Sequence, residues 1–485
     1  EEIAKNGQKD FEEIAKNTQK DFEEVAIPAI FASLDNIFME PERIFKRKIY
    51  DRLLQWKERS NGNSALLIEG ARRIGKSTIV DAFARNEYTS YIFIDFAKCS
   101  QEVKDLFNDV SDLNYLFLRL QLIYGVQLVE RKSLIVFDEV QFQPLARQAI
   151  KSFVEDHRYD YIETGSLISI RKNTQNILIP SEEERISMYP MDYEEFRWAL
   201  GDEVTIPMLR QVFREWKPLG DDVNRKLMRD FRLYMLVGGM PQAIDMYLET
   251  LDFMRVDQIK RTILDLYEED FYELDPSGKT SMMFRSIPVQ LNSNASRYKV
   301  SSVIEGGRVE RLQNQLAILK DSMTTLVALH SNDPSVGLTL HQNPNQFKIY
   351  CCDTGLFVTM AFWDGESVEN KIYEKLLSDK LATDLGYVYE NVVAQMLASA
   401  GNKLFYHTWP TEEGNRNYEI DFIISRQSKI CPIEVKSSQS KEHHSIDRFI
   451  QKYSSRILTS YMLYTKDMRK EKDLVCLPMY MAAML

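Results

Sequence analysis

Cysteine and histidine are scarce, and neither type is spaced like a set of metal ligands. The five cysteines include no CxxC pair, and the six histidines form no cluster. A disulfide framework and a structural zinc site are therefore not expected, whereas a reducing compartment such as the cytoplasm is. Long apolar runs are also missing. None reaches the roughly 18 residues that cross a bilayer, and no signal peptide opens the chain, so we expect no membrane partner.

The chain also has no excess of positive charge. Lys and Arg number 61 and Asp and Glu 72, which gives a net charge of −11 over 485 residues. A chain this acidic does not coat nucleic acid as a polycation, so any nucleic acid must bind through a local basic patch. The length and a hydrophobic content of 44% predict about three globular domains.

The first 38 residues contain a repeat. EEIAKNGQKDF at 1–11 recurs as EEIAKNTQKDF at 12–22 and begins again at 23. An 11-residue period is about three helical turns, so residues 1–38 could form a short coiled-coil or docking helix. The preferred interpretation is a duplicated or added extension outside the working protein, which would then start near Met39.

Residues 39–200 alternate short apolar runs with helical stretches. Four runs predict buried parallel strands, at 64–69, 91–96, 133–140 and 159–166. The segments between them are long enough for crossover helices, so we expect an α/β domain with the doubly wound parallel sheet of a P-loop NTPase. Downstream, the sequence predicts a helical lid over 201–275, a winged-helix-like segment over 276–345 and a second α/β domain over 346–485.

A glycine-containing loop follows the first of these runs. Residues 70–77, GARRIGKS, match the pattern GxxxxGK[ST] in full. The glycines let successive backbone N–H groups turn towards phosphate oxygens, and the N-terminus of the next helix adds partial positive charge. We expect Lys76 to reach the β- and γ-phosphates of ATP and Ser77 to place its hydroxyl on Mg²⁺. The predicted nucleotide-binding set is Gly70, Ala71, Arg72, Arg73, Ile74, Gly75, Lys76, Ser77 and Thr78.

The third run ends in two carboxylates. Asp138 and Glu139 close the apolar strand LIVFDE, 62 residues after Lys76. This is the edge at which open α/β sheets bind their ligands. Asp138 is therefore predicted to complete the Mg²⁺ shell and Glu139 to polarise the attacking water.

Two later positions are candidates for sensing the γ-phosphate. The fourth run ends in Thr164 and Ser166, and either hydroxyl could contact the terminal phosphate or simply cap the next helix. The sequence does not distinguish between the two. Arg185 could supply a transition-state cation, although a solvated surface arginine is the simpler interpretation.

Near the C-terminus, two apolar runs flank a polar turn. If Gln427 and Ser428 form a two-residue loop, the residue numbers of cross-strand partners sum to 855, and Asp421 lies opposite Glu434 in a non-hydrogen-bonded pair. Two carboxylates this close are destabilising unless a cation joins them, and Lys436 lies on the same face as Glu434. Such a cluster could bind a divalent metal through Asp421 and Glu434 while Lys436 positions a water at a phosphodiester.

Three neighbouring residues qualify this hypothesis. Glu390, on a predicted helix around 386–400, could be a fourth member of the cluster, and Glu419 would face Lys436. Charged residues also line ordinary solvated strand faces, which is the simpler interpretation. Pro432 lacks a backbone donor and so indicates an edge strand or a bulge.

Together these segments resemble a large prokaryotic family. GARRIGKST, LIVFDEVQ, YIETGS, MYPMDYEEF, VGGMPQA, FKIYCCDTGL and the terminal EIDFII and PIEVKSS occur in this order in AAA-type P-loop ATPases. The C-terminal domain of these ATPases has no known function and resembles the PD-(D/E)xK nucleases. The resemblance covers about residues 39–485.

This resemblance implies ATP binding and hydrolysis at the P-loop and a restriction-endonuclease-like fold at the C-terminus. The ATPase residues would be Lys76, Ser77, Asp138 and Glu139. The acidic and basic positions of the second fold would be Glu390, Asp421, Glu434 and Lys436.

Three classes of function are compatible with these features. The leading hypothesis is an ATPase that hydrolyses Mg–ATP and is coupled to a nuclease-like domain acting on nucleic acid. The alternative is a nucleotide-dependent switch that binds DNA, RNA or protein without cutting. The third is a structural or chaperone-like partner whose ATPase is indifferent to nucleic acid. A homo-oligomer is compatible with each.

Overall fold

The computed structural model describes residues 43–166, 180–293, 295–363, 370–378, 385–414, 416–437 and 443–485. The repeat in 1–38 and the start proposed near Met39 lie outside the described residues. The chain divides into two units, 1–44 and 45–485, and every element below belongs to the second. Among the described residues, no helix has the length and apolar character needed to cross a membrane.

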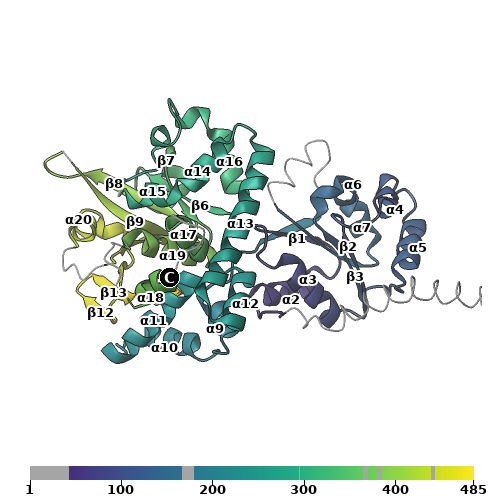
Figure 1. The fold of residues 1–485 in the computed structure, drawn as a ribbon, viewed down its shortest axis with the longest axis horizontal. Helices are drawn as coiled ribbons and strands as arrows, with labels where there is room; N and C mark the ends of the chain where they lie inside the picture. The colour runs from purple at the N-terminus through teal and green to yellow at the C-terminus, as the bar shows by residue number, and fades with distance from the viewer. Residues whose placement is uncertain are drawn as a thin grey trace, which may run out of the picture. The chain divides into compact units, whose positions relative to one another are not determined.

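A five-stranded parallel sheet forms the N-terminal part of this unit (Figure 1). Its strands are β1 (Ala65–Glu69), β2 (Ser90–Asp95), β3 (Ser133–Asp138), β4 (Asp160–Gly165) and β5 (Glu183–Ser187), in the order β2-β3-β4-β1-β5. The four predicted strands are confirmed. The fifth, β5, pairs with β1 at the sheet edge, and its charged sequence EERIS contains no apolar run that would have predicted it.

Helices cover both faces of this sheet, as a doubly wound fold requires. Alternate residues of a strand point to opposite faces, so Leu66 and Ile68 enter one apolar core and Ala65 and Leu67 the other. The first core includes residues of α2 (Ile49–Ser60) and α3 (Lys76–Glu87). The second includes residues of α4 (Gln101–Asp105), α5 (Leu113–Tyr124), α6 (Pro144–Gln148) and α7 (Ile150–Asp156).

A run of helices connects this sheet to the rest of the chain. It consists of α9 (Tyr193–Ala199), α10 (Thr205–Glu215), α11 (Asp221–Val237), α12 (Pro241–Thr250) and α13 (Phe253–Leu274). Phe231 and Tyr234 of α11 and Tyr267 of α13 are buried in the same core as Leu66 and Ile68 of β1. The helices and the P-loop sheet therefore share one continuous apolar core.

An eight-stranded mixed sheet forms the C-terminal part, in the order β12-β13-β11-β10-β9-β8-β6-β7. Its strands are β6 (Thr325–Ser331), β7 (Gln342–Cys351), β8 (Phe405–Pro410), β9 (Asn417–Arg426), β10 (Lys429–Val435), β11 (Ser460–Tyr464), β12 (Arg469–Glu471) and β13 (Leu474–Pro478). Because β6 and β7 pair with each other and β6 pairs with β8, this sheet begins before residue 346 and includes strands from the segment 276–345.

Helices surround the second sheet. They are α14 (Lys279–Arg285), α15 (Ile287–Asn292), α16 (Gln313–Asp321), α17 (Thr354–Ala361), α18 (Asn370–Leu377), α19 (Gly386–Ser399) and α20 (His444–Tyr453). The apolar α19 buries Val392, Val393 and Leu397 completely in the main core. Phe449 of α20 lies in a separate core with Ile420 of β9.

The predicted hairpin register is confirmed. Lys429 pairs with Arg426 and Ile433 with Phe422, so both pairs of residue numbers sum to 855. The expected edge position of Pro432 is wrong, because β10 lies between β9 and β11. A local irregularity is present instead. The parallel register with the following segment shifts by one residue between the bridge at Ile430 and the pairing at Ile433, which is where proline cannot donate to a neighbour.

Candidate functional site

The loop between β1 and α3 has the backbone that a phosphate-binding turn requires. Gly75 has φ of 90° and Arg73 φ of 67°, so the chain passes twice through the left-handed region. A Cβ atom on Gly70 would lie 2.6 Å from the Met188 carbonyl oxygen, which leaves room only for glycine. Lys76 then opens the 12-residue helix α3, whose N-terminus faces the loop.

The lysine of this loop is buried and points back into it. Its Nζ atom donates to the carbonyl oxygens of Gly70 at 3.0 Å and Ala71 at 2.9 Å. Burial lowers the pKa of Lys76, while the nearby carboxylates of Glu139 and Asp138 act in the opposite direction. An ammonium group in this position is available to exchange two weak carbonyl acceptors for the oxygens of a phosphate.

Four predicted residues meet at the ends of β3 and β4. The Ser77 hydroxyl donates to Asp138 Oδ1 at 2.8 Å, and the Thr164 hydroxyl donates to the same oxygen. The backbone N–H of Glu139 donates to Thr164 Oγ1 at 3.3 Å. Burial raises the pKa of Asp138, and the two hydroxyl donors oppose that rise. Hydroxyl and carboxylate oxygens such as those of Ser77 and Asp138 suit a hard cation such as Mg²⁺.

The second carboxylate is held in an unusual backbone conformation. Glu139 has φ of 52°, in the left-handed region that non-glycine residues rarely adopt. Its Oε2 atom accepts a hydrogen bond of 2.5 Å from the side chain of Gln141, two residues further on. The strained turn places the Glu139 side chain beyond the strand end rather than in the sheet.

The structure separates the two candidate sensor hydroxyls. Thr164 contacts Asp138 directly, as described above. Ser166 instead lines a small hollow beside the P-loop together with Arg72 and Tyr267. Arg185 forms an ion pair of 2.8 Å with Glu183, two residues away on the same strand. That arginine is therefore engaged within its own sheet.

A second layer of contacts holds the P-loop from the helical region. The Tyr267 hydroxyl of α13 donates to the Arg72 carbonyl oxygen at 2.9 Å, and Asp270 pairs with the Arg72 guanidinium at 2.9 Å. Burial raises the pKa of Asp270, and the charge of Arg72 opposes it. No local motif in the sequence marks Tyr267 or Asp270, because about 200 positions separate α13 from the loop.

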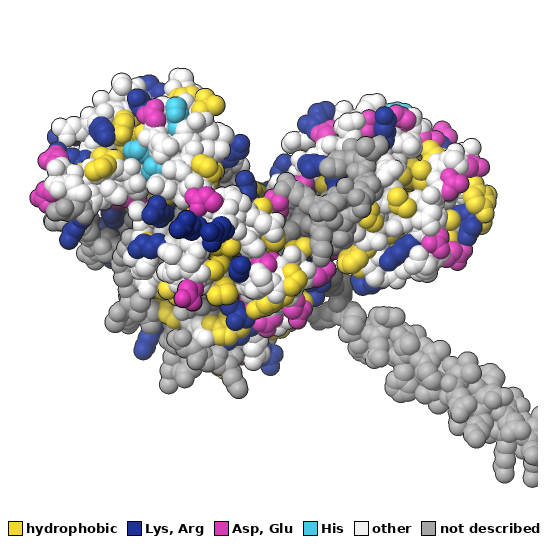
Figure 2. All heavy atoms as spheres, turned by 90° about the horizontal axis from the view of Figure 1, so that it is seen from above, with side chains coloured by type: hydrophobic (Ala, Val, Ile, Leu, Met, Phe, Trp, Pro, Cys, Tyr) yellow, Lys and Arg dark blue, Asp and Glu magenta, His cyan; other side chains and the backbone are white. Residues whose placement is uncertain are grey.

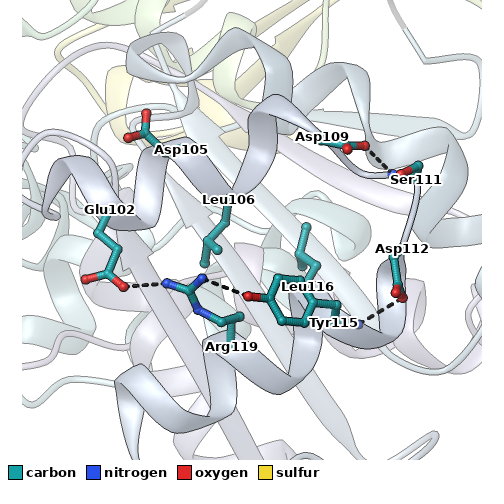
Figure 3. A pocket seen from close by; sticks show the side chains of 9 residues that line it. All are labelled: Glu102, Asp105, Leu106, Asp109, Ser111, Asp112, Tyr115, Leu116 and Arg119. Atoms are coloured by element: carbon teal, nitrogen blue, oxygen red, sulfur yellow. Dashed lines mark hydrogen bonds and ion pairs between the residues drawn. The ribbon is translucent and has the colours of Figure 1, made fainter.

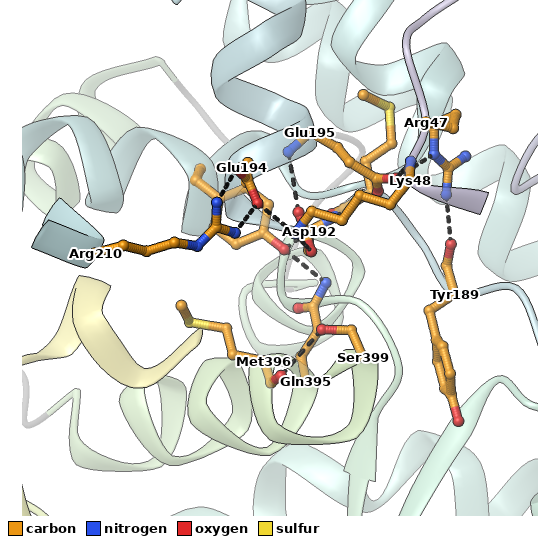
Figure 4. A network of polar contacts seen from close by, with 12 residues as sticks. Arg47, Lys48, Tyr189, Asp192, Glu194, Glu195, Arg210, Gln395, Met396 and Ser399 are labelled. Atoms are coloured by element: carbon orange, nitrogen blue, oxygen red, sulfur yellow. Dashed lines mark hydrogen bonds and ion pairs between the residues drawn. The ribbon is translucent and has the colours of Figure 1, made fainter. Parts of the chain in front are cut away.

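Arg47 holds the other side of the loop (Figure 4). This buried guanidinium donates to the carbonyl oxygens of Ile74 at 2.8 Å and Tyr189 at 2.7 Å, and its Nε atom lies 3.2 Å from Glu195 Oε1. It therefore joins the P-loop to the segment 188–195. The only sequence signal is the basic run Lys46–Lys48, which has no recognisable spacing relative to the loop.

The same network fixes the start of α9. Lys48 pairs with Asp192 at 2.5 Å and with Glu194 at 2.7 Å, and Arg210 of α10 forms a double contact with Glu194 (Figure 4). Asp192 and Glu195 also form a capping box at the helix N-terminus. The acidic residues of the motif MYPMDYEEF thus join the start of α9 to Lys48 and to α10.

Two further family-like motifs pack against each other. A Cβ atom on Gly239 would lie 2.1 Å from the Met191 carbonyl oxygen, and one on Gly355 would lie 2.6 Å from the Gly238 Cα atom. Asp353 accepts a hydrogen bond of 2.5 Å from the Gly239 N–H. VGGMPQA and CCDTGL therefore form a close backbone contact that joins the helical region to the C-terminal part.

A hollow of about 490 Å³ between α4 and α5 contains no P-loop residue (Figure 3). It is lined by Glu102, Asp105, Leu106, Asp109, Ser111, Asp112, Tyr115, Leu116 and Arg119. Arg119 bonds Glu102 at 2.5 Å and the Tyr115 hydroxyl at 3.2 Å, and Asp112 caps the N-terminus of α5. These polar groups of the hollow thus bond to one another or cap a helix.

The predicted C-terminal residues gather in one cluster, in which Glu434 is buried and Glu390, Asp421 and Lys436 are partly exposed. Lys436 pairs with Glu434 Oε1 at 2.7 Å, and Asp421 Oδ2 accepts a hydrogen bond of 2.8 Å from the Val435 N–H. Burial raises the pKa of Asp421 well above its ordinary value, and the charge of Glu434 adds to the rise. Burial also raises the pKa of Glu434, although Lys436 opposes it.

Lys348 of β7 is a member of this cluster that sequence analysis missed. Its Nζ atom lies 2.7 Å from Glu390 Oε1 and 2.5 Å from Glu419 Oε1, and the Tyr350 hydroxyl donates to Glu390 at 2.5 Å. Burial opposes the charge on Lys348, yet Glu390 raises the pKa of this lysine well above its ordinary value. The hairpin register predicts that Glu419 faces Lys436, and the ion pair of Glu419 is with Lys348.

The carboxylate oxygens of this cluster show how far it could hold a metal ion. Within the described ranges, no group of three or more His, Cys, Asp or Glu side chains is arranged to hold a metal ion. Glu390 is engaged by Lys348 and Tyr350. Glu434 Oε2, however, is buried without a hydrogen-bond partner, and a buried oxygen of this kind requires a proton or a cation. Asp421 and Glu434 thus offer a cation two ligands, not a complete shell.

Three segments of the chain match known families. Residues 62–197 match an AAA domain, residues 228–367 a domain of unknown function (DUF8612) and residues 385–481 another domain of unknown function (DUF4143). No curated protein sequence matches the chain significantly. The N-terminal α/β part is therefore a P-loop domain of the AAA type, which implies that it binds a nucleotide.

Two of the solved structures that are weakly similar to this chain are ATPases or motors. The RuvB Holliday junction branch migration motor of Thermotoga maritima is 11% identical over 59% of this chain and 91% of its own, with a TM-score of 0.26. A signal transduction ATPase with numerous domains from Pyrococcus horikoshii, which has a tetratricopeptide repeat sensor, is 11% identical over 73% of this chain and 48% of its own, with a TM-score of 0.25.

Proposed function

We propose that the chain binds Mg–ATP at residues 70–77 and hydrolyses it. The observation that carries this proposal is the convergence of Lys76, Ser77, Asp138 and Thr164 at one sheet edge. Ser77 and Thr164 both donate to Asp138, and Lys76 is buried in the adjoining loop. These residue types are the ones that bind a triphosphate and its cation in P-loop proteins.

Each residue has a distinct role in this proposal. The loop N–H groups and Lys76 bind the β- and γ-phosphates, and Lys76 exchanges its carbonyl acceptors for phosphate oxygens. Ser77 and Asp138 would hold Mg²⁺, which neutralises charge on the phosphates when it is bound. Glu139 orients and polarises the attacking water, and Thr164 contacts Asp138 beside it.

The test of hydrolysis uses one conservative change. Glu139→Gln keeps the side-chain shape but removes the basic oxygen, so phosphate release should fall by about 10²-fold or more while ATP binding persists. The matched control is Glu130→Gln, which changes an exposed glutamate of the same domain. Unchanged phosphate release by Glu139→Gln would remove Glu139 from the mechanism.

A second candidate function is metal-dependent phosphodiester hydrolysis in the C-terminal cluster. It is favoured by the unpartnered buried oxygen of Glu434 next to Asp421 and Lys436. Asp421 and Glu434 would hold a divalent cation, and Lys436 would position a water. Glu390 would act by fixing Lys348 rather than as a free ligand, given its contacts.

Cleavage and binding can be separated experimentally. We would incubate the full chain with labelled DNA and RNA in Mg²⁺ or Mn²⁺, and compare wild type with Asp421→Asn. Cleavage that disappears in Asp421→Asn supports the second candidate. Binding without cleavage supports the alternative, a nucleotide-dependent switch, and leaves the ATPase proposal untouched.

A further inference from the structure

The segment 286–320 carries a net positive charge, although the chain as a whole is negatively charged. It contains five cations against two acids, Glu305 and Glu310, and so carries +3 in a chain of −11. The cations Arg297, Lys299, Arg308, Arg311 and Lys320 are all exposed. Figure 2, seen from above relative to Figure 1, shows a group of Lys and Arg side chains in the foreground. We call Arg297, Lys299, Arg308 and Arg311 the basic face.

Buried neighbours hold the first half of the basic face in place. Tyr298 and Val300 are buried, whereas Arg297 and Lys299 between and beside them are exposed. The Tyr298 N–H donates to the Phe347 carbonyl oxygen at 2.7 Å, so this stretch is tied to β7. The alternation therefore directs both cations outward from a fixed backbone.

Among the described residues, none of the four cations of the basic face forms an ion pair within 4.0 Å. The nearby Arg285, by contrast, is paired with Glu268. Four unpaired cations within 15 positions of one another create a local positive potential that attracts an extended anion.

One end of the basic face lies near the carboxylate cluster of the second sheet. The tether of this face, Phe347, immediately precedes Lys348 on β7. Burial raises the pKa of Tyr406 and the charge of Arg297 opposes the rise, and the Tyr406 ring lies 5.6 Å from Lys348 Nζ. A polyanion bound at Arg297 would therefore run close to the strands that carry the cluster.

The composition of the segment indicates which polyanion fits. Its one aromatic residue, Tyr298, is buried, so the segment offers no platform on which single-stranded bases could stack. Val289, at 68%, is the one large apolar side chain of the segment that is exposed among the described residues, so a protein partner would find a single small anchor and no apolar patch. Exposed cations with serine hydroxyls between them suit phosphates.

We propose that the basic face binds the phosphate backbone of a nucleic-acid duplex. This concerns binding alone. It goes beyond ATP hydrolysis and rests neither on that reaction nor on cleavage in the C-terminal cluster. Because the contacts are to phosphates, the affinity depends on salt and little on base sequence.

The test is fluorescence anisotropy of the full chain with labelled 20-base-pair DNA, the same duplex as RNA, and single-stranded DNA. The variant replaces all four residues of the basic face by alanine. The matched control replaces four exposed cations elsewhere, Lys132, Arg214, Lys226 and Arg229, by alanine and so has the same net charge. Unchanged ATP turnover and thermal midpoint show that both variants fold.

The salt dependence gives the expected size of the effect. Four phosphate contacts contribute about 0.9 each to the slope of log affinity against log salt, or roughly 3.6 in total. Between 50 and 200 mM KCl, wild type should therefore lose ~10²-fold more affinity than the four-alanine variant. The control should keep the wild-type slope. The DNA and RNA arms show which duplex is preferred.

Three results would overturn the proposal. The first is the absence of binding to either duplex at low salt. The second is an equal slope for wild type and the four-alanine variant, or an equal loss in the control. The third is tighter binding of the single strand than of both duplexes. None of these outcomes bears on Glu139→Gln, so failure here is distinct from failure of the ATPase proposal.

Discussion

Arg47 provides a quantitative test of how the P-loop is held. Arg47→Met keeps the aliphatic stem but removes hydrogen bonds to the carbonyl oxygens of Ile74 and Tyr189, and it leaves the buried Glu195 without its cation. Each hydrogen bond from a charged donor contributes about 1.5–3 kcal/mol, and loss of one member of a buried pair costs about 3–5 kcal/mol. Because these terms overlap, we expect a loss of ~3–5 kcal/mol.

The assay for Arg47→Met has two readouts. For a domain of this size, ~3–5 kcal/mol corresponds to a fall of roughly 10 °C in thermal midpoint. If the P-loop of Arg47→Met adopts its ATP-binding conformation only about one tenth of the time, the variant would bind ATP about tenfold more weakly than wild type. The double variant Arg47→Met/Glu195→Gln should recover part of the stability, because it no longer buries an unpaired carboxylate.

The matched control is Arg52→Met. Arg52 is exposed, and its contact to the Ser187 carbonyl oxygen is long, at 3.4 Å. If Arg47→Met loses no more thermal stability than Arg52→Met and binds ATP with wild-type affinity, Arg47 does not hold the loop.

Three other substitutions test separate parts of the structure. Gly239→Ala places a methyl group 2.1 Å from the Met191 carbonyl oxygen, so we expect a loss of at least ~3 kcal/mol in urea unfolding. Asp270→Asn removes a negative charge beside Arg72, so ATP should bind about fivefold more tightly, or ~1 kcal/mol, by calorimetry, with little change in stability. Asp421→Asn should raise the thermal midpoint at pH 8 more than at pH 5, because the raised pKa of Asp421 means that its charge disfavours folding.

The sign of the pH effect follows from proton binding. The folded chain holds the Asp421 proton to a higher pH than the unfolded chain does, so wild-type stability declines as pH rises above about 4, the ordinary aspartate pKa. If the stability of Asp421→Asn declines with pH as steeply as that of wild type, Asp421 is not the origin of the effect.

For Gly239→Ala, the control is Gly401→Ala. A Cβ atom at Gly401 meets no atom within 4 Å, so this substitution should cost only about 1 kcal/mol for its left-handed backbone.

Contiguous motifs made most of the P-loop site predictable. Residues 70–77 and the strand ending at Asp138 each combine a characteristic spacing with a characteristic local fold, so the sequence alone places them at one sheet edge. The C-terminal register was predictable for a similar reason, because a two-residue turn fixes the pairs from Lys429 with Arg426 to Ile433 with Phe422. The pairing of Asp421 with Glu434, one position beyond them, stays a prediction.

Residues brought together only by tertiary packing were not predictable. Arg47, Asp270 and Lys348 contact partners 27 to 198 positions away in the sequence, and no periodicity marks such contacts. The edge strand β5 has too little apolar character to be recognised. Pro432 lies in an interior strand because its neighbour shifts register at that point, which the proline alone does not reveal.

The central claim is that residues 70–77 bind a magnesium-complexed nucleotide. Isothermal titration calorimetry of ATP into the full chain tests it most directly, with and without Mg²⁺ and with Lys76→Ala for comparison. We predict one ATP per chain for wild type, weaker binding when EDTA removes the magnesium, and no measurable binding by Lys76→Ala. Equal ATP affinity in wild type and Lys76→Ala would contradict the claim.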